Sequence, residues 1–292
     1  MIFWRSIVFR NLCACAGVVC LTITLFSACA VPGADSSEQF SASSVSPESS
    51  AVLTDSSVQS PEVSGNEQEQ QVSAYDFSQP VPESEAVDNS YFQDAAFVGD
   101  SRTDGFLIYS GIGCGENLTS NGLSIFKLAE KKVLKRDGVS YTLLEALAQK
   151  RYGKIYLSLG INELGYNDDE GFYRAYCDAV DAIRSCQPDA VIYIQGLIPV
   201  NEKVVAAAGG PSYLENDHLL VYNDLMKQVA REKQVAFLDL NPEFTDGTGQ
   251  LPADASKDGV HLKSSYCKQW LEYLKIHTVD YKTLYPDTEM VK

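Results

Sequence analysis

The sequence predicts an α/β fold, a three-layer α/β/α sandwich in which helices cover both faces of a parallel β-sheet. Two observations support this prediction. From about residue 91 onward, short runs of almost continuously apolar residues recur along the chain, as expected for strands that are buried on both faces. Amphipathic helical patterns separate these runs, and strands that alternate with helices are typical of a parallel sheet.

Four apolar runs predict the strands of the sheet. They are AAFVGD (95–100), KIYLSLG (154–160), AVIYIQGLIP (190–199) and VAFLDL (235–240). Polar residues follow each run, among them Ser101, Asn162, Asn201 and Asn241. Because ligands bind at the carboxyl ends of parallel strands, we expect the functional residues to gather at this edge of the sheet.

Helices are predicted in the segments between and after these strands. They cover residues 142–150, 171–186, 217–233 and 264–277. In the three longer segments, aromatic and aliphatic residues recur at three- and four-residue spacing along one face. We interpret these aromatic stripes as faces that pack on the core. Residues 201–217 are the candidate for a loop at the rim of the site.

The N-terminal part of the chain has a different composition. Arg5 and Arg10 precede an apolar stretch without charge, which is the order of regions in a secretory signal. An anchor that is not cleaved is the alternative. Residues 30–90 are rich in Ser, Glu, Pro and Gln and hold eleven acidic and no basic residues, which indicates a disordered tether. The predicted organisation is a signal (1–28), a tether (29–90) and a folded domain (91–286).

The stretch LFSAC, which ends at Cys29, resembles a bacterial lipobox. This resemblance implies cleavage before Cys29 and attachment of lipid to its sulfur atom. Several acyl chains together would hold the protein stably on a membrane. We therefore expect an exported protein that is lipid-anchored at the cell membrane and faces outside.

Composition narrows the range of functions. The formal net charge of −16 argues against a nucleic acid as partner. The cysteines beyond Cys29 form no C-x-x-C pair and no cluster with histidine, so we predict no metal site. They are Cys114, Cys177, Cys186 and Cys267.

Ser101 is a candidate nucleophile, because it follows the first strand directly. A serine nucleophile needs a base, a group that orients the base, and donors for the developing oxyanion. Asp258 and His261 stand three residues apart with Gly259 between them, in the loop before the last long helix. Such a loop lets the carboxylate contact Nδ1 of the imidazole, so that Nε2 can act as the base. Asp239 and Asp254 are rival partners for the histidine, without this spacing.

Three blocks, FVGDSR, GINEL and DGVH, occur in this order and resemble those of the SGNH (GDSL-type) hydrolase superfamily over about residues 91–280. The resemblance implies the flavodoxin-like fold of that superfamily and a serine hydrolase that needs no cofactor. It also implies the roles of individual residues. Ser101 would be the nucleophile, His261 the base and Asp258 its orienting partner. The backbone N–H groups of Ser101 and Gly122 and the side-chain amide of Asn162 would form the oxyanion hole.

The match departs from the family pattern at two positions. Arg102 stands where the name-giving branch has leucine, and this form resembles the acetyl-esterase-like branches better than the lipases. It is a candidate contact for an anionic substrate, with a surface or structural salt bridge as the alternative. In GINEL, Glu163 replaces the aspartate of the family block G-x-N-D. The family has one more block between FVGDSR and GINEL, which is only a glycine in a loop after the first helix. Its assignment is open between Gly122 and three nearby rivals, Gly111, Gly113 and Gly115.

These observations predict a monomeric, exported serine esterase that hydrolyses acyl esters through an acyl-enzyme. The expected location favours O-acetyl groups on cell-envelope glycans as the substrate, with the membrane as a partner through the lipid at Cys29. Three alternatives remain at this stage. They are an O-acyltransferase with the same catalytic residues, a lysophospholipase or thioesterase, and a binding lipoprotein without catalytic activity.

Overall fold

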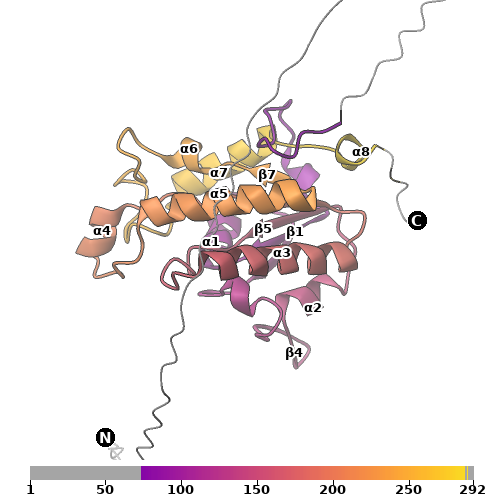
Figure 1. The fold of residues 1–292 in the computed structure, drawn as a ribbon, viewed down its shortest axis with the longest axis horizontal. Coiled ribbons are helices and arrows are strands. Elements are labelled where there is room, and N and C mark those ends of the chain that lie inside the picture. Colours follow the sequence, from indigo (N-terminus) through magenta and orange to yellow (C-terminus); the bar gives the residue numbers. More distant parts are fainter. Residues whose placement is uncertain (1–73, 287, 289–292) are drawn as a thin grey trace, which may run out of the picture. The chain divides into compact units, whose positions relative to one another are not determined.

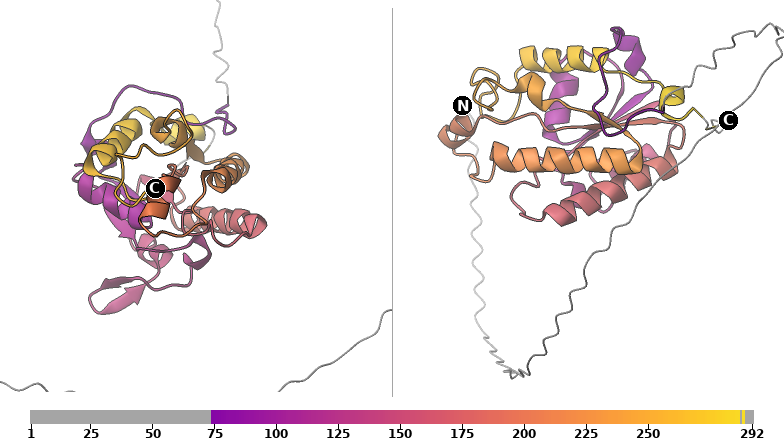
Figure 2. Two further views of the ribbon diagram at one scale, coloured as in Figure 1. Left: turned by 90° about the vertical axis from the view of Figure 1, so that its left-hand side faces the viewer. Right: turned by 45° about the horizontal axis from the view of Figure 1, so that its top comes forward.

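A computed structural model describes residues 74–286 and 288. Its centre is a sheet of parallel strands in the order β2-β1-β5-β6-β7. These strands are β1 (Ala95–Gly99), β2 (Glu116–Thr119), β5 (Lys154–Ser158), β6 (Val191–Gln195) and β7 (Ala236–Leu238). A separate antiparallel hairpin of β3 (Leu134–Arg136) and β4 (Val139–Tyr141) projects from the body, as the left view of Figure 2 shows.

Helices lie on both sides of the sheet (Figure 1), so the predicted three-layer fold is confirmed. One side carries α2 (Leu143–Leu147), α3 (Asp169–Cys186) and α5 (Asn216–Lys233). The other side carries α1 (Ser101–Tyr109), α6 (Asn241–Phe244), α7 (Ser264–Ile276) and α8 (Tyr281–Leu284). The remaining helices are α4 (Glu202–Ala207) and the 3-10 turns η1 (Asn89–Phe92) and η2 (Ile125–Lys127).

Alternation of side chains along each strand fills two separate cores. On β1, Ala96 and Val98 pack with α2, α3 and α5, whereas Phe97 packs with α1 and α7. The rings of Phe97, Tyr156 and Tyr193 stack on one another across β1, β5 and β6, which holds these strands in register. Burial on both faces explains why the strands appear in the sequence as unbroken apolar runs.

Three segments differ from the sequence-based expectation. The edge strand β2 was not predicted, because only Leu118 among its residues is buried. The predicted rim loop 201–217 contains α4 and the start of α5.

The predicted tether extends too far toward the C-terminus. Val81 N–H donates to the carbonyl of Phe237 over 2.9 Å, and Ser84 N–H donates to the carbonyl of Ile276 over 2.6 Å. These contacts place the last part of the tether on the folded domain.

The predicted signal, Cys29 and the rest of the tether lie outside the described residues. Within residues 74–286, no helix combines the length and the apolar character needed to cross a bilayer.

Candidate active site

Ser101 is the first residue of α1 and stands directly after β1. The turn between them is tight. A Cβ atom on Gly99 would lie 2.2 Å from the hydroxyl of Thr103, so only glycine fits there. Asp100 caps α1 by accepting the N–H of Arg102 over 2.9 Å. Asp100 therefore has a structural role in this turn.

Ser101, His261 and Asp258 form one hydrogen-bonded row, although they come from distant parts of the sequence. The hydroxyl Oγ of Ser101 lies 2.9 Å from Nε2 of His261. Nδ1 of the same ring lies 2.7 Å from Oδ2 of Asp258. With a proton on Nδ1, the imidazole can accept the proton of Ser101 at Nε2. The row thus has the geometry that activates a serine nucleophile.

The loop around Asp258 fixes this carboxylate in place. Its second oxygen, Oδ1, accepts the backbone N–H of His261 over 2.8 Å and that of Val260 over 2.9 Å. The hydroxyl of Ser256 lies 2.9 Å from the same oxygen. Burial raises the pKa of Asp258, but its hydrogen bonds with the side chain and backbone of His261, with Val260 and with Ser256 outweigh burial and lower that pKa well below its usual range. Asp258 is therefore a carboxylate at neutral pH.

The rival partners of the histidine are engaged elsewhere. Oδ1 of Asp254 accepts the hydroxyl of Tyr266 over 3.1 Å. Asp239 follows β7 directly, and its carboxyl group has a hydrogen bond with the backbone of Asn241. The three-residue spacing in the sequence therefore identified the acid that contacts His261.

Gly259 joins the loop to the start of α4. Its φ of +83° lies in the left-handed region, and its carbonyl accepts the N–H of Asn201 over 2.9 Å. A Cβ atom here would lie 2.6 Å from both the carbonyl oxygen of Asn201 and a methyl group of Val205. The first turn of α4 thus sets the position of the segment between Asp258 and His261.

Replacing Gly259 with alanine should lower kcat/KM for p-nitrophenyl acetate by about 10- to 100-fold, because the clash would displace His261 relative to Ser101. The measurement is steady-state kinetics, with circular dichroism to verify the fold. Gly247→Ala is the matched control, since a Cβ atom added at Gly247 would meet nothing within 4 Å. Equal activity of the two variants would show that Gly259 does not position the loop.

The order of the strands decides which of the candidate glycines can belong to the oxyanion hole. Gly122 follows the carboxyl end of β2, and β2 runs parallel to β1 beside it. The N–H of Ser120 donates to the carbonyl of Gly99 over 3.1 Å, which holds this segment next to Ser101. The rival glycines precede β2 and lie at the opposite edge of the sheet; they are Gly111, Gly113 and Gly115. Gly122 is therefore the candidate that lies at the edge of the sheet where Ser101 lies.

Asn162 lies at the same edge, but its amide is engaged in the structure. Nδ2 donates to Oδ2 of Asp100 and to the carbonyl of Leu123, each over 3.0 Å. Asn162 therefore connects the residue before Ser101 with the residue after Gly122. To stabilise an oxyanion as expected, Nδ2 would have to share one of these hydrogens with the substrate.

Glu163 is a structural part of the site that the sequence analysis did not recognise. Its side chain is fully buried, and Oε1 accepts the N–H of Ile125, the first residue of η2. Burial, together with the nearby Asp100, raises the pKa of Glu163 to about 7, and burial raises that of Asp100 to about 6. Because glutamate is longer than the aspartate of the family pattern, it can reach η2. The side chains of residues 162 and 163 together hold the segment that carries Gly122 in place.

The guanidinium of Arg102 is engaged by backbone carbonyl groups. The residue is buried, and its guanidinium donates to the carbonyl of Ile198 over 2.8 Å and to that of Pro199 over 3.3 Å. Burial lowers the pKa of Arg102 to about 10, so the group stays charged at neutral pH. Arg102 thus fixes the segment that follows β6. It also lines the cleft beside Ser101, and its role as a substrate contact stays a prediction.

Two clefts meet at Ser101 and His261. The α1 cleft, of about 270 Å³, lies toward α1 and α7 and is lined by Ile108, Tyr109, Asn121 and Leu262 among others. The rim cleft, of about 290 Å³, lies toward the segment after α4 and is lined by Asn162, Val205, Pro211 and Tyr213 among others. An ester bound at Ser101 can therefore place its acyl group in one cleft and its alcohol in the other. The described residues contain no group of three or more His, Cys, Asp or Glu side chains suited to a metal ion.

The chain was compared with known protein families and with solved structures. The model of the GDSL-like Lipase/Acylhydrolase family matches residues 97–265. A structure from Streptococcus pneumonia, provisionally described as a platelet activating factor, has 21% sequence identity and a TM-score of 0.51, and the match covers 62% of this chain and 82% of that chain. This likeness supports the fold. No curated protein sequence matches the chain.

Two further solved structures are similar at lower scores. One is provisionally described as an SGNH hydrolase from Slackia heliotrinireducens, with 18% identity, a TM-score of 0.46, and coverage of 62% of this chain and 96% of that chain. The other is a peptidoglycan O-acetylesterase, with 23% identity, a TM-score of 0.43, and coverage of 56% of this chain and 46% of that chain.

Proposed function

The chain belongs to the GDSL-like lipase/acylhydrolase family and is a hydrolase, and we propose that it cleaves acyl esters through an acyl-enzyme on Ser101. The hydrogen-bonded row of Ser101, His261 and Asp258 is the observation that carries this proposal. Its position at the carboxyl edge of the sheet, where two clefts meet, gives an ester access from both sides.

In the proposed reaction, Oγ of Ser101 attacks the acyl carbon while its proton moves to Nε2 of His261. The N–H groups of Ser101 and Gly122 and the amide of Asn162 are the proposed donors to the oxyanion. When the intermediate collapses, the ester C–O bond breaks and His261 gives its proton to the leaving alcohol. Water then attacks the acyl-enzyme, His261 takes a proton from it, and this proton returns to Oγ of Ser101 as the acid leaves.

The proposed substrate is a small acyl ester, in particular an O-acetyl group on a cell-envelope glycan. Clefts of about 270 and 290 Å³ on the two sides of Ser101 support a short acyl group on one side and a sugar unit on the other. Tyr109 and Tyr213, which line these clefts, are 53% and 44% exposed and can offer their ring faces to a sugar.

The acyl preference is tested with p-nitrophenyl esters of increasing chain length. We expect kcat/KM to be highest for the acetate and to fall for longer chains, because neither cleft next to Ser101 exceeds about 290 Å³. A rise in kcat/KM toward long chains would contradict the O-acetyl proposal and favour a lipid substrate.

We also propose that the mature protein is exported and carries lipid on Cys29. The lipobox-like LFSAC supports this proposal. Metabolic labelling with a fatty acid should mark the wild-type protein, and Cys29→Ala should abolish the label, with Cys114→Ala as the matched control. Label that persists in Cys29→Ala would refute attachment at this residue.

A further inference from the structure

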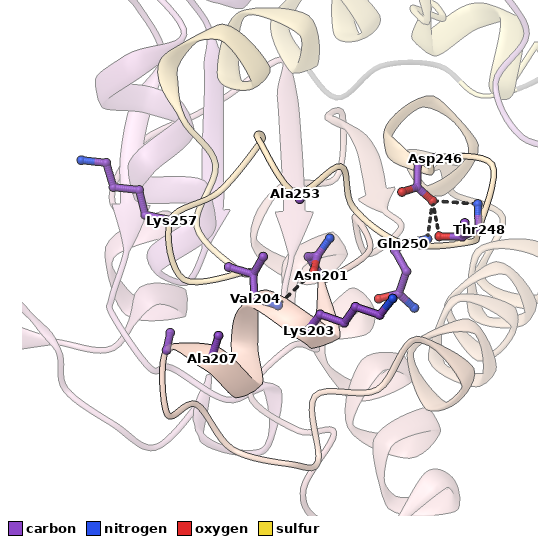
Figure 3. Close-up of a pocket in the computed structure, with 10 residues that line it drawn as sticks. Asn201, Lys203, Val204, Ala207, Asp246, Thr248, Gln250, Ala253 and Lys257 are labelled. Atoms are coloured by element: carbon purple, nitrogen blue, oxygen red, sulfur yellow. Dashed lines mark hydrogen bonds between the residues drawn. The ribbon is translucent and has the colours of Figure 1, made fainter.

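A third cleft, of about 560 Å³, lies beside α4 (Figure 3). We call it the lysine cleft; it is lined by α4 and by the loop between α6 and Asp258, including Lys203, Ala208, Asp246, Gln250 and Lys257. Ala208 lines both this cleft and the rim cleft beside Ser101. The lysine cleft is therefore next to the position where the ester would react.

Small residues stand between the two clefts. Ala207 and Ala208 line the lysine cleft, and Ala208, Gly209 and Gly210 line the rim cleft; all four are exposed. Beside them, Val204 lines the lysine cleft and Val205 lines the rim cleft. A chain-like substrate bound at Ser101 can thus continue past these residues into the lysine cleft.

The free side-chain nitrogens of the lysine cleft are all hydrogen-bond donors. Within the described residues, Nζ of Lys203 and Nζ of Lys257 make no hydrogen bond or ion pair. Gln250 accepts the N–H of Glu202 with its carbonyl oxygen over 3.0 Å, which leaves its Nε2 free. Donors without acceptors, two of them charged, suit a ligand that carries anionic oxygen atoms.

One acidic side chain also lines the cleft, but hydrogen bonds within its own turn occupy its carboxylate group. Asp246 accepts the N–H and the hydroxyl of Thr248 over 2.8 and 2.7 Å, and the N–H of Gln250 over 3.1 Å. These hydrogen bonds lower the pKa of Asp246, with Thr248 contributing most, so it is a carboxylate. Two lysines against one internally bonded carboxylate leave the cleft with a net positive charge, in a chain whose net charge is −16.

The two lysines stand at opposite ends of the cleft. Figure 3 shows Lys203 extending toward Gln250, whereas Lys257 points away from both. Such separated charges match a ligand with anionic groups at intervals along its length better than they match a single small ion.

We propose that the lysine cleft is a substrate subsite that binds anionic groups, carboxylate or phosphate, on a glycan chain whose acyl ester reacts at Ser101. This inference rests on the proposed function and defines its substrate class as an acylated anionic glycan. The subsite binds the polymer away from the reacting bond, so it contributes mainly to KM.

The test compares three chemically O-acetylated cello-oligosaccharides of equal length: one carboxymethylated, one phosphorylated and one without anionic groups. The wild-type protein should have a higher kcat/KM for an anionic chain than for the neutral chain. In the double variant Lys203→Gln/Lys257→Gln, this ratio should fall at least about fivefold, through KM. Added salt should lower the wild-type ratio in the same direction. The comparison between carboxylate and phosphate chains identifies which anion the cleft prefers.

The matched control is Lys268→Gln/Lys282→Gln, which removes two exposed lysines that line none of the three clefts. If the ratio of kcat/KM for an anionic chain to kcat/KM for the neutral chain is the same in both double variants, the proposal of a subsite is overturned.

Binding of the three oligosaccharides is also measured by calorimetry. This measurement distinguishes a failure of the subsite from a failure of the proposed function. If wild-type protein hydrolyses no ester, the esterase proposal fails. The subsite is still supported if an anionic chain binds and the Lys203→Gln/Lys257→Gln variant loses that binding. It is overturned if no anionic chain binds better than the neutral one.

Discussion

Ser101→Ala should reduce the kcat for p-nitrophenyl acetate by about 10⁴- to 10⁶-fold. The variant has no nucleophile, so no acyl-enzyme can form, and the activity that remains comes from the oxyanion donors and from binding. The fold should be unaffected, because among residues 74–286 the hydrogen bond of Ser101 Oγ is with the exposed side chain of His261. Unfolding curves of variant and wild type should therefore differ by no more than about 1 kcal/mol.

A fluorophosphonate probe provides an independent measurement, since it reacts covalently with an activated serine. Wild-type protein should be labelled at Ser101, and Ser101→Ala should not be labelled. Ser265→Ala is the matched control, because Ser265 is exposed on α7 and lines none of the described clefts. Undiminished turnover by folded Ser101→Ala protein would exclude this residue as the nucleophile and reopen the possibility of a binding lipoprotein.

The layers of the fold could be predicted because burial leaves a direct mark on the sequence. Strands covered on both faces must be largely apolar. β1 has no polar side chain, and β5 and β6 have polar residues only at their ends, namely Lys154, Ser158 and Gln195. The edge strand β2 leaves no such mark, since its pairing with β1 depends on backbone hydrogen bonds that any residue can make. The segment before β1 was misjudged for a similar reason. It contacts β7 and α7 through its backbone, and Val81, Tyr75, Phe77 and Val87 pack on the core. These few apolar residues stand in a sequence that otherwise has the composition of a linker.

The proximity of Ser101, Asp258 and His261 could be predicted from topology and spacing together with the resemblance of three blocks to the SGNH superfamily. A residue after a parallel strand and a residue in a loop before a helix both reach the same edge, and a three-residue spacing lets a carboxylate contact an imidazole. The environment of Arg102 could not be predicted in this way. Whether an arginine faces solvent or the carbonyls of Ile198 and Pro199 depends on the path of a segment almost a hundred residues away.

The same limit applies to the segment that carries Gly122. The sequence contains Asn162 and Glu163 as neighbours, but not the contacts that make them act together. Asn162 donates to the carbonyl of Leu123, and Glu163 accepts the N–H of Ile125. These two bonds hold both sides of one short turn, so the oxyanion donor proposed at Gly122 depends on side chains from the loop after β5. Positions of this kind emerge only from the three-dimensional structure.

Asp258→Asn should lower kcat by roughly 10³- to 10⁴-fold while the fold is retained. The reason is the direction of hydrogen bonding at the imidazole. Asp258 accepts at both oxygens, from Nδ1 of His261 at Oδ2 and from two backbone N–H groups and Ser256 at Oδ1. An asparagine can keep its single oxygen at the Oδ1 position, where most of these donors point. Its NH₂ group then faces Nδ1 and donates to it.

A donor at that place reverses the tautomer of the imidazole, because Nδ1 must then accept and the proton moves to Nε2. His261 can no longer take the proton of Ser101, although all distances in the row stay the same. Kinetics on p-nitrophenyl acetate measure the loss, and Asp254→Asn is the matched control in the same loop, since asparagine there can still accept from Tyr266. Near wild-type activity in Asp258→Asn would mean that His261 does not depend on this carboxylate for its tautomer. A loss in Asp254→Asn alone would transfer the orienting role to the rival acid.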